Sequence, residues 1–293
     1  MKFASYKINE KATYGAVLEQ ENGIYLTDIG AVYGRDLRYW IETDSMGVLQ
    51  AIAQTSLVAS LESEIEYLPP ILSGQKIVCI GVNYAERNAE YKDNSDLPKY
   101  PSVFLRYLDS FTGHRRPLVR PPESDQLDYE GEIVIIIGKG GRRIPKERAL
   151  KHIAGLTLMN EGTIRDWVRH AKFNVTQGKN FEKSGSIGPW MVTADEIGDV
   201  ANLQIETRVN GELRQNDNTS RLLFPFDYIV SYLSTFMTLK PGDMIATGTP
   251  NGAGARFEPP IYLQPGDCVE VSATGLGVLS NGVEDENTFL KKN

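Results

Sequence analysis

The 293-residue sequence has only two cysteines, three histidines and no long apolar run. Cys79 and Cys268 are too few for a disulfide framework, and both lie in apolar, strand-like segments, so we interpret them as buried free thiols. No apolar run reaches the roughly 18 residues needed to cross a bilayer. The N-terminal segment also lacks the apolar stretch of a signal peptide. These absences predict a protein of a reducing cytoplasm, without a membrane partner.

Basic residues are outnumbered as well. The chain has 31 Lys and Arg residues and 38 Asp and Glu residues, which gives a formal net charge of −7. Binding to nucleic acid requires a basic face, and the basic pairs in this chain, such as Arg142-Arg143, are short. We therefore expect no nucleic-acid partner. Serine-hydrolase elbow, HExxH and CxxC motifs are absent too, so those kinds of catalytic or metal site are not predicted.

The composition is that of a globular protein with a substantial core. Hydrophobic residues make up 41% and charged residues 24% of the chain, which lies in the usual range for folded domains. The segment Leu68-Pro69-Pro70 is a natural linker, because proline disfavours both helix and central strand. We predict a small N-terminal α+β domain at residues 1–70 and a larger domain at residues 71–293.

Short strands separated by glycine and proline dominate the larger region. Residues 76–81 and the β-branched run 133–137 are typical of buried strands. Asn210-Gly211 predicts a tight hairpin with a type I′ turn, and residues 226–236 have helical spacing. Many short strands and few helices favour a β-rich α+β fold over a doubly wound one.

Two acidic residues flank a glycine at the start of the run 133–137. Residues i and i+2 of a strand face the same side, so Glu130 and Glu132 are expected to project together, with Gly131 between them lacking a side chain. Adjacent carboxylates repel each other unless they are solvated or bind a cation. From the pair alone, two solvated acids at an exposed strand end are the favoured interpretation, and the apolar run that follows raises the odds of a cation.

Glu161, in Asn160-Glu161-Gly162, is a candidate third carboxylate. Three anionic oxygens suit a hard divalent cation such as Mg²⁺ or Mn²⁺ better than Zn²⁺. The alternative for Glu161 is favourable electrostatics at a helix start. Four residues later, Arg165 and Asp166 are interpreted as a structural ion pair.

Two further segments carry candidates for anion binding. Lys179 follows Gly178 in a loop and can neutralise an enolate or a carboxylate, with a solvated surface lysine as the alternative. Thr249 lies in the Gly-rich segment 246–254, where backbone N–H groups and the hydroxyl can bind an anionic group. A plain turn is the competing interpretation.

Histidine is scarce, so candidates for a general base are few. His114, in a predicted loop, is the one plausible histidine base, whereas His152 and His170 are expected to be structural or solvated. Arg87 and Glu90 lie three residues apart and share one face of a short predicted helix. A surface ion pair is the alternative for these two.

In this order the segments resemble the fumarylacetoacetate hydrolase superfamily, over about residues 76–279. The resemblance rests on the blocks GVNYAERNAE, DYEGEIVIIIGK, NEGTIRDW, QGKNFEKSGSIGPWMVT and LKPGDMIATGTPNGAG, and on the closing PGDCVEV and GLGVLSN. It implies a mixed β-sandwich roll, usually assembled into homodimers, with a small N-terminal domain in many members.

The resemblance also implies a set of site residues. It implies an Mg²⁺ or Mn²⁺ site at Glu130, Glu132 and Glu161, where the family usually has Asp at the third position. It further implies that Lys179 and Thr249 contact the 2-oxo-acid end of a substrate.

The sequence departs from the family at Arg87, since many members carry histidine there as half of a water-activating dyad with the position of Glu90. Arginine stays protonated and cannot act as a base. Either His114 or Glu90 therefore acts as the base, or the reaction needs no activated water. Arg87 can instead bind a substrate carboxylate in a bidentate fork.

We expect a metal-dependent hydrolase that cleaves a C–C bond of a 2,4-dioxo acid such as fumarylpyruvate or maleylpyruvate, through an enolate. The alternative is a decarboxylase, isomerase or hydratase of a 2-oxo acid such as oxaloacetate, and the missing histidine favours this class. A non-catalytic metal-binding protein is a lesser alternative. The predicted catalytic residues are Glu90, His114 and Lys179. The predicted substrate contacts are Tyr84, Arg87, Arg106 and Thr249.

Overall fold

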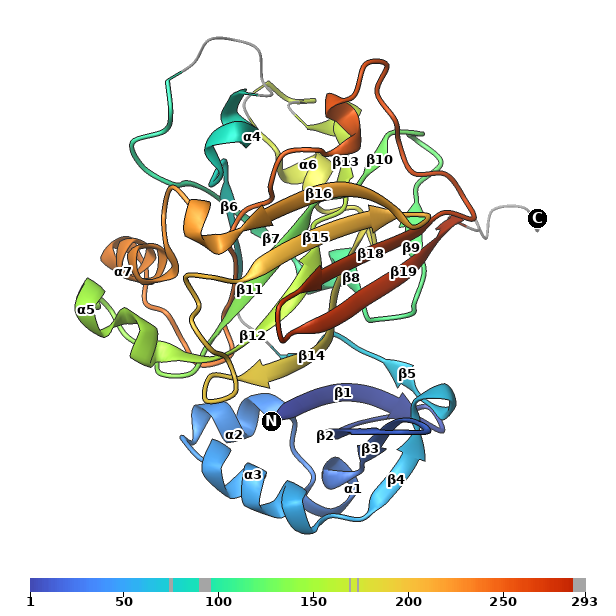
Figure 1. Ribbon diagram of the computed structural model, residues 1–293, viewed down its shortest axis with the longest axis vertical. Coiled ribbons are helices and arrows are strands. Elements are labelled where there is room, and N and C mark those ends of the chain that lie inside the picture. The colour runs from blue at the N-terminus through green and yellow to red at the C-terminus, as the bar shows by residue number, and fades with distance from the viewer. Residues whose placement is uncertain (74–75, 90–95, 169, 173, 287–293) are drawn as a thin grey trace.

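The computed structural model describes residues 1–73, 76–89, 96–168, 170–172 and 174–286 (Figure 1). The fold is a strand-rich mixture of α and β structure, in which a twelve-stranded sheet packs against a five-stranded sheet and neither sheet closes into a barrel. The predicted β-rich α+β class is confirmed.

The twelve-stranded sheet runs through the whole molecule. Its main path is β4 (Val58–Leu61), β3 (Gly23–Thr27), β2 (Lys11–Gln20), β1 (Lys2–Ile8), β14 (Gly185–Thr193), β12 (Ile153–Asn160), β11 (Gly131–Ile137), β17 (Met244–Ala246), β6 (Ile77–Gly81) and β7 (Ser102–Arg106). Beside this path, β5 (Glu66–Tyr67) pairs with β1 and β8 (Phe111–Thr112) pairs with β14. Because β1 pairs antiparallel with β14, the N-terminal strands extend the sheet of the larger region. The domain boundary at residue 70 stays a prediction.

The second sheet covers one face of the first (Figure 1). Its strand order is β16 (Glu212–Asn218), β15 (Gln204–Val209), β18 (Cys268–Ala273), β19 (Gly277–Asp285) and β9 (Leu118–Arg120). A separate ribbon pairs β10 (Leu127–Asp128) with β13 (Thr163–Ile164). Between β15 and β16, Asn210 and Gly211 have φ values of 52° and 80°, which a type I′ turn requires. The predicted hairpin is confirmed.

The helices of the described residues are short. They are α1 (Ile29–Tyr33), α2 (Leu37–Glu42), α3 (Met46–Thr55), α4 (Ala85–Ala89), α5 (Lys146–Ala149), α6 (Thr176–Lys179) and α7 (Phe226–Phe236). Buried residues of α1, α2, α3 and α7 belong to the core clusters of the sheets. The bounds of α7 match the predicted helix, because its residues at helical spacing, including Phe226, Ile229 and Leu233, are buried against the sheet. Within the described ranges, no helix is long and apolar enough to cross a membrane.

The apolar side chains of strand β11 alternate between two core clusters. Ile133, Ile135 and Ile137 pack into the cluster between the sheets, whereas Val134 and Ile136 pack into the cluster on the opposite face. Both faces of β11 are therefore covered, which explains a continuous apolar run without polar alternation. Glu130 and Glu132 continue the row of Val134 and Ile136, so the two carboxylates lie where that second core ends.

The cysteines are both free, as predicted. Cys79, on β6, is fully buried in the second core cluster. Cys268, at the start of β18, is partly exposed, so the prediction of burial was wrong for this residue. Its position at the strand end leaves its side chain only half covered.

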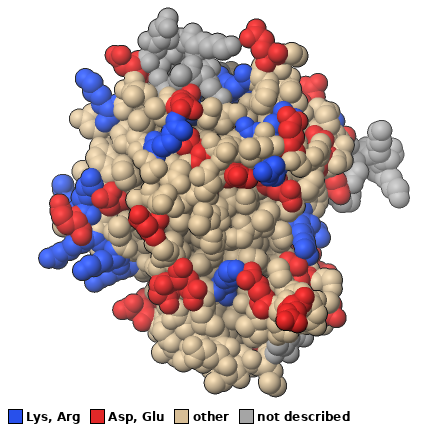
Figure 2. Space-filling model, viewed as in Figure 1, with Lys and Arg blue, Asp and Glu red and all other residues tan. Residues whose placement is uncertain are grey.

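The charged side chains on the face shown in Figure 2 are mixed in sign. Acidic and basic groups are scattered among uncharged residues in that view, and basic side chains gather at its left edge near α5. The view shows no extended basic stripe, in keeping with the net charge of −7.

Candidate metal centre and active site

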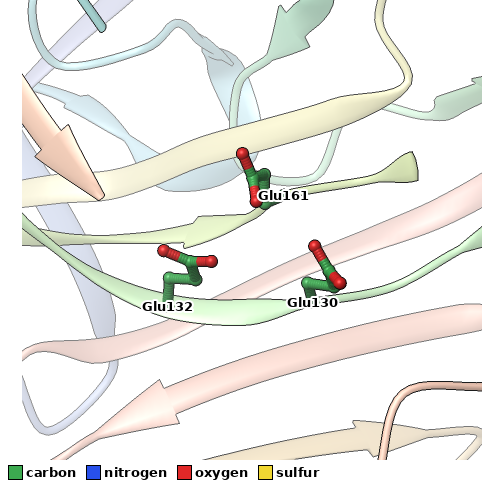
Figure 3. Close-up of side chains that lie close together, drawn as sticks. All are labelled: Glu130, Glu132 and Glu161. Carbon is green, nitrogen blue, oxygen red and sulfur yellow. The ribbon is translucent and has the colours of Figure 1, made fainter. Parts of the chain in front are cut away.

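Three carboxylates from separate stretches of the chain converge at one end of the large sheet. Glu130 immediately precedes β11, Glu132 lies in it, and Glu161 immediately follows β12. One carboxylate oxygen from each lies within 4.8 Å of the others. Figure 3 shows the three side chains turned toward a common point. Their exposed fractions are only 1–3%, so this is not a cluster of solvated surface acids.

The backbone explains why these three residues meet. Extended structure places Glu130 and Glu132 on one side of the strand, while Gly131 faces the second sheet, where an added Cβ would lie 2.0 Å from Thr207 Oγ1. The antiparallel register pairs Gly131 with Asn160, which brings Glu161 beside the pair. In addition, the N–H of Glu161 donates to the carbonyl oxygen of Glu130 at 2.7 Å.

Glu130 is surrounded by cations. Its two carboxylate oxygens accept from Arg87 at 2.8 Å, from Arg165 at 2.7 Å and from Lys179 at 2.5 Å. Burial alone would raise the pKa of Glu130, but Arg165, Lys179 and Arg87 together hold that pKa well below its ordinary value. Glu130 is thus an anion in the folded protein.

Glu132 has the opposite environment. Burial, followed by repulsion from Glu161 and Glu130, raises the pKa of Glu132 well above its ordinary value. The N–H of Gly248 donates to its carboxylate at 2.7 Å. Anionic Glu132 therefore needs more positive charge than the protein supplies to it.

Glu161 is only partly compensated. One of its oxygens accepts from Lys179 at 2.9 Å, but within the described part of the chain the buried Oε1 atom has no hydrogen-bond partner. A buried acceptor without a partner is costly, and a hard cation would satisfy it. The all-oxygen donor set, the raised pKa of Glu132 and this unpartnered oxygen fit a divalent ion of the Mg²⁺ or Mn²⁺ type.

Lys179 lies inside the site and is not the surface lysine that was its alternative interpretation. It ends α6 and is 6% exposed, with its Nζ atom between Glu130 and Glu161. Burial would lower the pKa of Lys179, but Glu130 and Glu161 outweigh it and raise that pKa. The ammonium group therefore stays charged.

A cavity of about 890 Å³ opens onto these groups. It is lined by charged side chains and by apolar side chains from β7 and the segment before α6. The polar lining includes Arg87, Glu130, Glu132, Glu161, Arg165, Lys179, Thr249 and Arg256. The apolar lining includes Val103, Phe104, Leu105, Val168 and Val175. Such a mixture is typical of a site for a small polar ligand.

Three predicted residues do not line this cavity. The fully buried guanidinium of Arg106 donates to the carbonyl oxygen of Gly162 at 2.9 Å and to the hydroxyl groups of Ser184 and Ser110 at 3.1 and 3.2 Å. It also lies over the ring of Phe111. The protein itself uses these donors, so the structure places Arg106 outside the cavity lining, and its assignment to substrate binding stays a prediction. Arg106 instead braces the backbone that follows Glu161.

Tyr84 and His114 are also placed elsewhere. The side chain of Tyr84 is buried in the core between the sheets. The backbone of Tyr84 forms an isolated antiparallel β-bridge with Leu222. His114 Nδ1 accepts from the N–H of Ser280, and its ring packs on the edge of Tyr67. Neither residue is in the cavity lining, so the structure does not bring Tyr84 or His114 to the site, and a substrate contact at Tyr84 and a base at His114 stay predictions. Glu90 lies outside the described residues, and its role stays a prediction.

Two important residues of the site were missed or misinterpreted in the sequence. Arg165 pairs with Asp128 and Glu130, whereas Asp166 accepts from Ser124, so the proposed Arg165–Asp166 pair is wrong. Asp128, fully buried, accepts from the N–H groups of Gly254 and Ala255 at 2.8 and 2.9 Å. In the sequence, Asp128 lies two residues before Glu130, and this spacing in an extended segment could have indicated that both side chains lie on the same side of the chain.

Comparisons with known proteins point to one family. Residues 76–284 match the family model described as "Fumarylacetoacetate (FAA) hydrolase C-terminal". "Oxaloacetate tautomerase YisK" of Bacillus subtilis (strain 168) is 41% identical over 225 residues, which cover 75% of this chain and 74% of that protein. "Oxaloacetate tautomerase FAHD2B, mitochondrial" of Bos taurus is 37% identical over 241 residues, covering 82% and 76%.

A solved structure matches nearly the whole chain. The fumarylacetoacetate hydrolase from psychrophilic Exiguobacterium antarcticum is 33% identical, with a TM-score of 0.84 over 97% of this chain and 99% of that one. The match includes the small N-terminal region and confirms the predicted fold.

Proposed function

Because the chain belongs to the fumarylacetoacetate hydrolase family, we propose that it is a divalent-metal-dependent tautomerase of a small 2-oxo dicarboxylate, with oxaloacetate as the leading substrate. The observation that carries the proposal is the cavity in which three buried carboxylates stand beside four cationic side chains. The relatives at 37% and 41% identity are named for this reaction. C–C hydrolysis, the first expectation from the sequence, becomes the competing function.

Glu130, Glu132 and Glu161 would hold the metal ion. Bound there, Mg²⁺ or Mn²⁺ would act as a Lewis acid toward the carbonyl oxygen of the 2-oxo acid. The unpartnered Oε1 of Glu161 and the raised pKa of Glu132 support this assignment.

The cationic side chains match a dianionic substrate. Arg87, Arg165, Lys179 and Arg256 all line the cavity. Charged Lys179 stabilises negative charge that develops on an enolate oxygen, and it cannot serve as a base while its pKa is raised. The apolar wall from β7 limits water around the reacting carbons.

Tautomerisation asks less of the protein than hydrolysis does. In the keto-to-enol direction, one proton leaves C3 and one proton reaches the oxygen on C2, while no bond between carbons breaks and no water is consumed. Hydrolysis would also need an activated water. Arg87 cannot take a proton from water, and His114 is not in the cavity lining, so Glu90, outside the described residues, is the one predicted base that remains for hydrolysis. This favours tautomerisation.

The test follows the enol form of oxaloacetate by its ultraviolet absorbance after dilution of the enol into buffer with Mg²⁺. The expected result is a protein-dependent decay to the keto form that stops when EDTA is added. Parallel assays measure CO₂ release from oxaloacetate and pyruvate release from fumarylpyruvate. Pyruvate release without enol decay would favour the hydrolase, and CO₂ release at the rate of enol decay would favour a decarboxylase.

A further inference from the structure

A buried glutamine links the Gly-rich segment to the strand that carries the carboxylates. Gln215, on β16, is 1% exposed. Its Nε2 group donates to the hydroxyl oxygen of Thr249 and to the carbonyl oxygen of Pro250, both at 2.8 Å. Its Oε1 atom accepts from the N–H of Gly131 at 2.9 Å. Every polar atom of this amide is thus used.

The partners fix the orientation of the amide. If Oε1 and Nε2 of Gln215 exchanged places, an amide oxygen would face the carbonyl oxygen of Pro250, and N–H would face the N–H of Gly131. Both contacts are repulsive, so only the observed orientation satisfies all three neighbours. Gln215 is therefore a hydrogen-bond donor to Thr249.

This donation determines what Thr249 can offer to a ligand. A hydroxyl group has one hydrogen to donate and accepts through its lone pairs, and the Thr249 oxygen already accepts from Gln215. Within the described residues, no protein acceptor takes the Thr249 hydrogen, while Thr249 lines the cavity. That hydrogen is left to point at an oxygen of a bound ligand.

The same amide also ties Thr249 to the proposed metal site. Gly131 lies between Glu130 and Glu132, and the N–H of Gly248 donates to Glu132. The threonine and the carboxylates therefore share one hydrogen-bonded frame, which sets the position of the hydroxyl relative to Glu132.

We propose that Gln215 is a positioning residue that makes Thr249 a dedicated hydrogen-bond donor to a carboxylate or enolate oxygen of the ligand. The assignment deepens the proposed function and rests on it for the identity of the substrate. It also explains a preference for ligands that present an acceptor at this point, because Gln215 occupies one of the two lone pairs of the Thr249 hydroxyl while the hydroxyl hydrogen is left for the ligand.

The experiment is a double-mutant cycle read by oxalate binding in saturating Mg²⁺, measured by calorimetry. Oxalate presents two carboxylates and mimics the enolate end of the substrate. Thr249→Val is expected to weaken oxalate binding about tenfold, and Gln215→Met by a similar factor, since each removes or misdirects one charge-assisted hydrogen bond. The double variant is expected to bind within about twofold of the weaker single variant.

Controls separate positioning from folding. Thr249→Ser keeps the hydroxyl and should stay within about threefold of the wild type while remaining sensitive to Gln215→Met. Gln204→Met makes the same change on an exposed residue of neighbouring β15 and should leave binding unchanged. If Gln215→Met fails to fold, the cycle is repeated with Gln215→Glu, which keeps the shape and the acceptor for Gly131.

Wild-type oxalate affinity in Gln215→Met, or losses that multiply in the double variant, would overturn the inference. A loss of Mg²⁺ affinity equal to the loss of oxalate affinity would also overturn it, because Gln215 would then act only through the carboxylate strand. If the wild type binds oxalate but fails to tautomerise oxaloacetate, the proposed function falls while the cycle still decides the role of Gln215.

Discussion

The guanidinium group of Arg87 lies 2.8 Å from a carboxylate oxygen of Glu130, and both side chains are buried. This ion pair connects helix α4 to the carboxylate cluster. The entry to the helix is fixed as well, because the Asn83 side chain donates to the carbonyl oxygens of Thr247 and Phe224. Arg87 therefore serves as a counter-ion at the position where many family members carry a base.

Replacing Arg87 with methionine should affect metal and substrate in opposite directions. Loss of a cation near the carboxylates should strengthen Mg²⁺ binding by roughly threefold. Loss of a guanidinium that lines the cavity should lower kcat/KM for oxaloacetate by about tenfold or more. Calorimetry and the enol-decay assay measure the two effects. Arg221→Met, at an exposed arginine that pairs with Glu86, is the matched control, and equal changes in both variants would contradict the assignment.

Lys179 supplies the second prediction. Lys179→Met removes a buried cation between Glu130 and Glu161, so the metal-free protein should lose roughly 3 kcal/mol of unfolding free energy. Mg²⁺ should recover most of that loss, because a divalent ion replaces the missing charge. Thermal melts with and without Mg²⁺ test this.

Lys183→Met, at an exposed lysine that pairs with Glu182, provides the comparison for Lys179→Met. Its melting temperature should change little under either condition. A loss of stability in Lys179→Met that saturating Mg²⁺ leaves untouched would argue against a shared cation site.

Glu132 should make the metal-free protein less stable as the pH rises. Its pKa in the folded state is raised, so the folded protein holds a proton that the unfolded chain has already released. The unfolding free energy then falls between the ordinary carboxyl pKa and the raised one. Glu132→Gln should remove this slope in urea denaturation across that pH range.

The same Glu132→Gln variant should lose the rise in melting temperature that Mg²⁺ gives the wild type, since a neutral amide is a poor ligand for a hard cation. Glu284→Gln, at an exposed glutamate on β19, should keep the full rise. An unchanged response to Mg²⁺ in Glu132→Gln would remove this residue from the metal site.

Features set by local pattern were predictable from the sequence. The helical spacing of α7, the Asn210-Gly211 turn and the strand period that aligns Glu130 with Glu132 all depend on neighbours within a few residues. The approach of Glu161 also depends on the register of β11 against β12, which the sequence alone does not specify.

The partners of side chains that make contacts far along the chain could not be predicted from the sequence. Arg106 is 78 positions from Ser184, and His114 is 166 positions from Ser280. Gln215 likewise contacts Gly131 across 84 positions. Whether such a side chain faces a cavity or braces the backbone is decided by tertiary packing, which periodicity does not encode.

His114 provides the last prediction, in which a structural role replaces a catalytic one. Burial, with a smaller effect from Arg115, lowers the pKa of His114 from 6.5 to about 4. The unfolded chain thus binds a proton that the folded protein rejects, and stability is lost as the pH falls from about 6.5 to about 4. His114 accounts for up to roughly 3 kcal/mol of that loss. In His114→Asn the amide oxygen can accept from Ser280, so this acid sensitivity should shrink in denaturant titrations, while kcat for oxaloacetate stays within about twofold of the wild type. A collapse of kcat in a variant that folds normally would instead return His114 to the list of candidate bases.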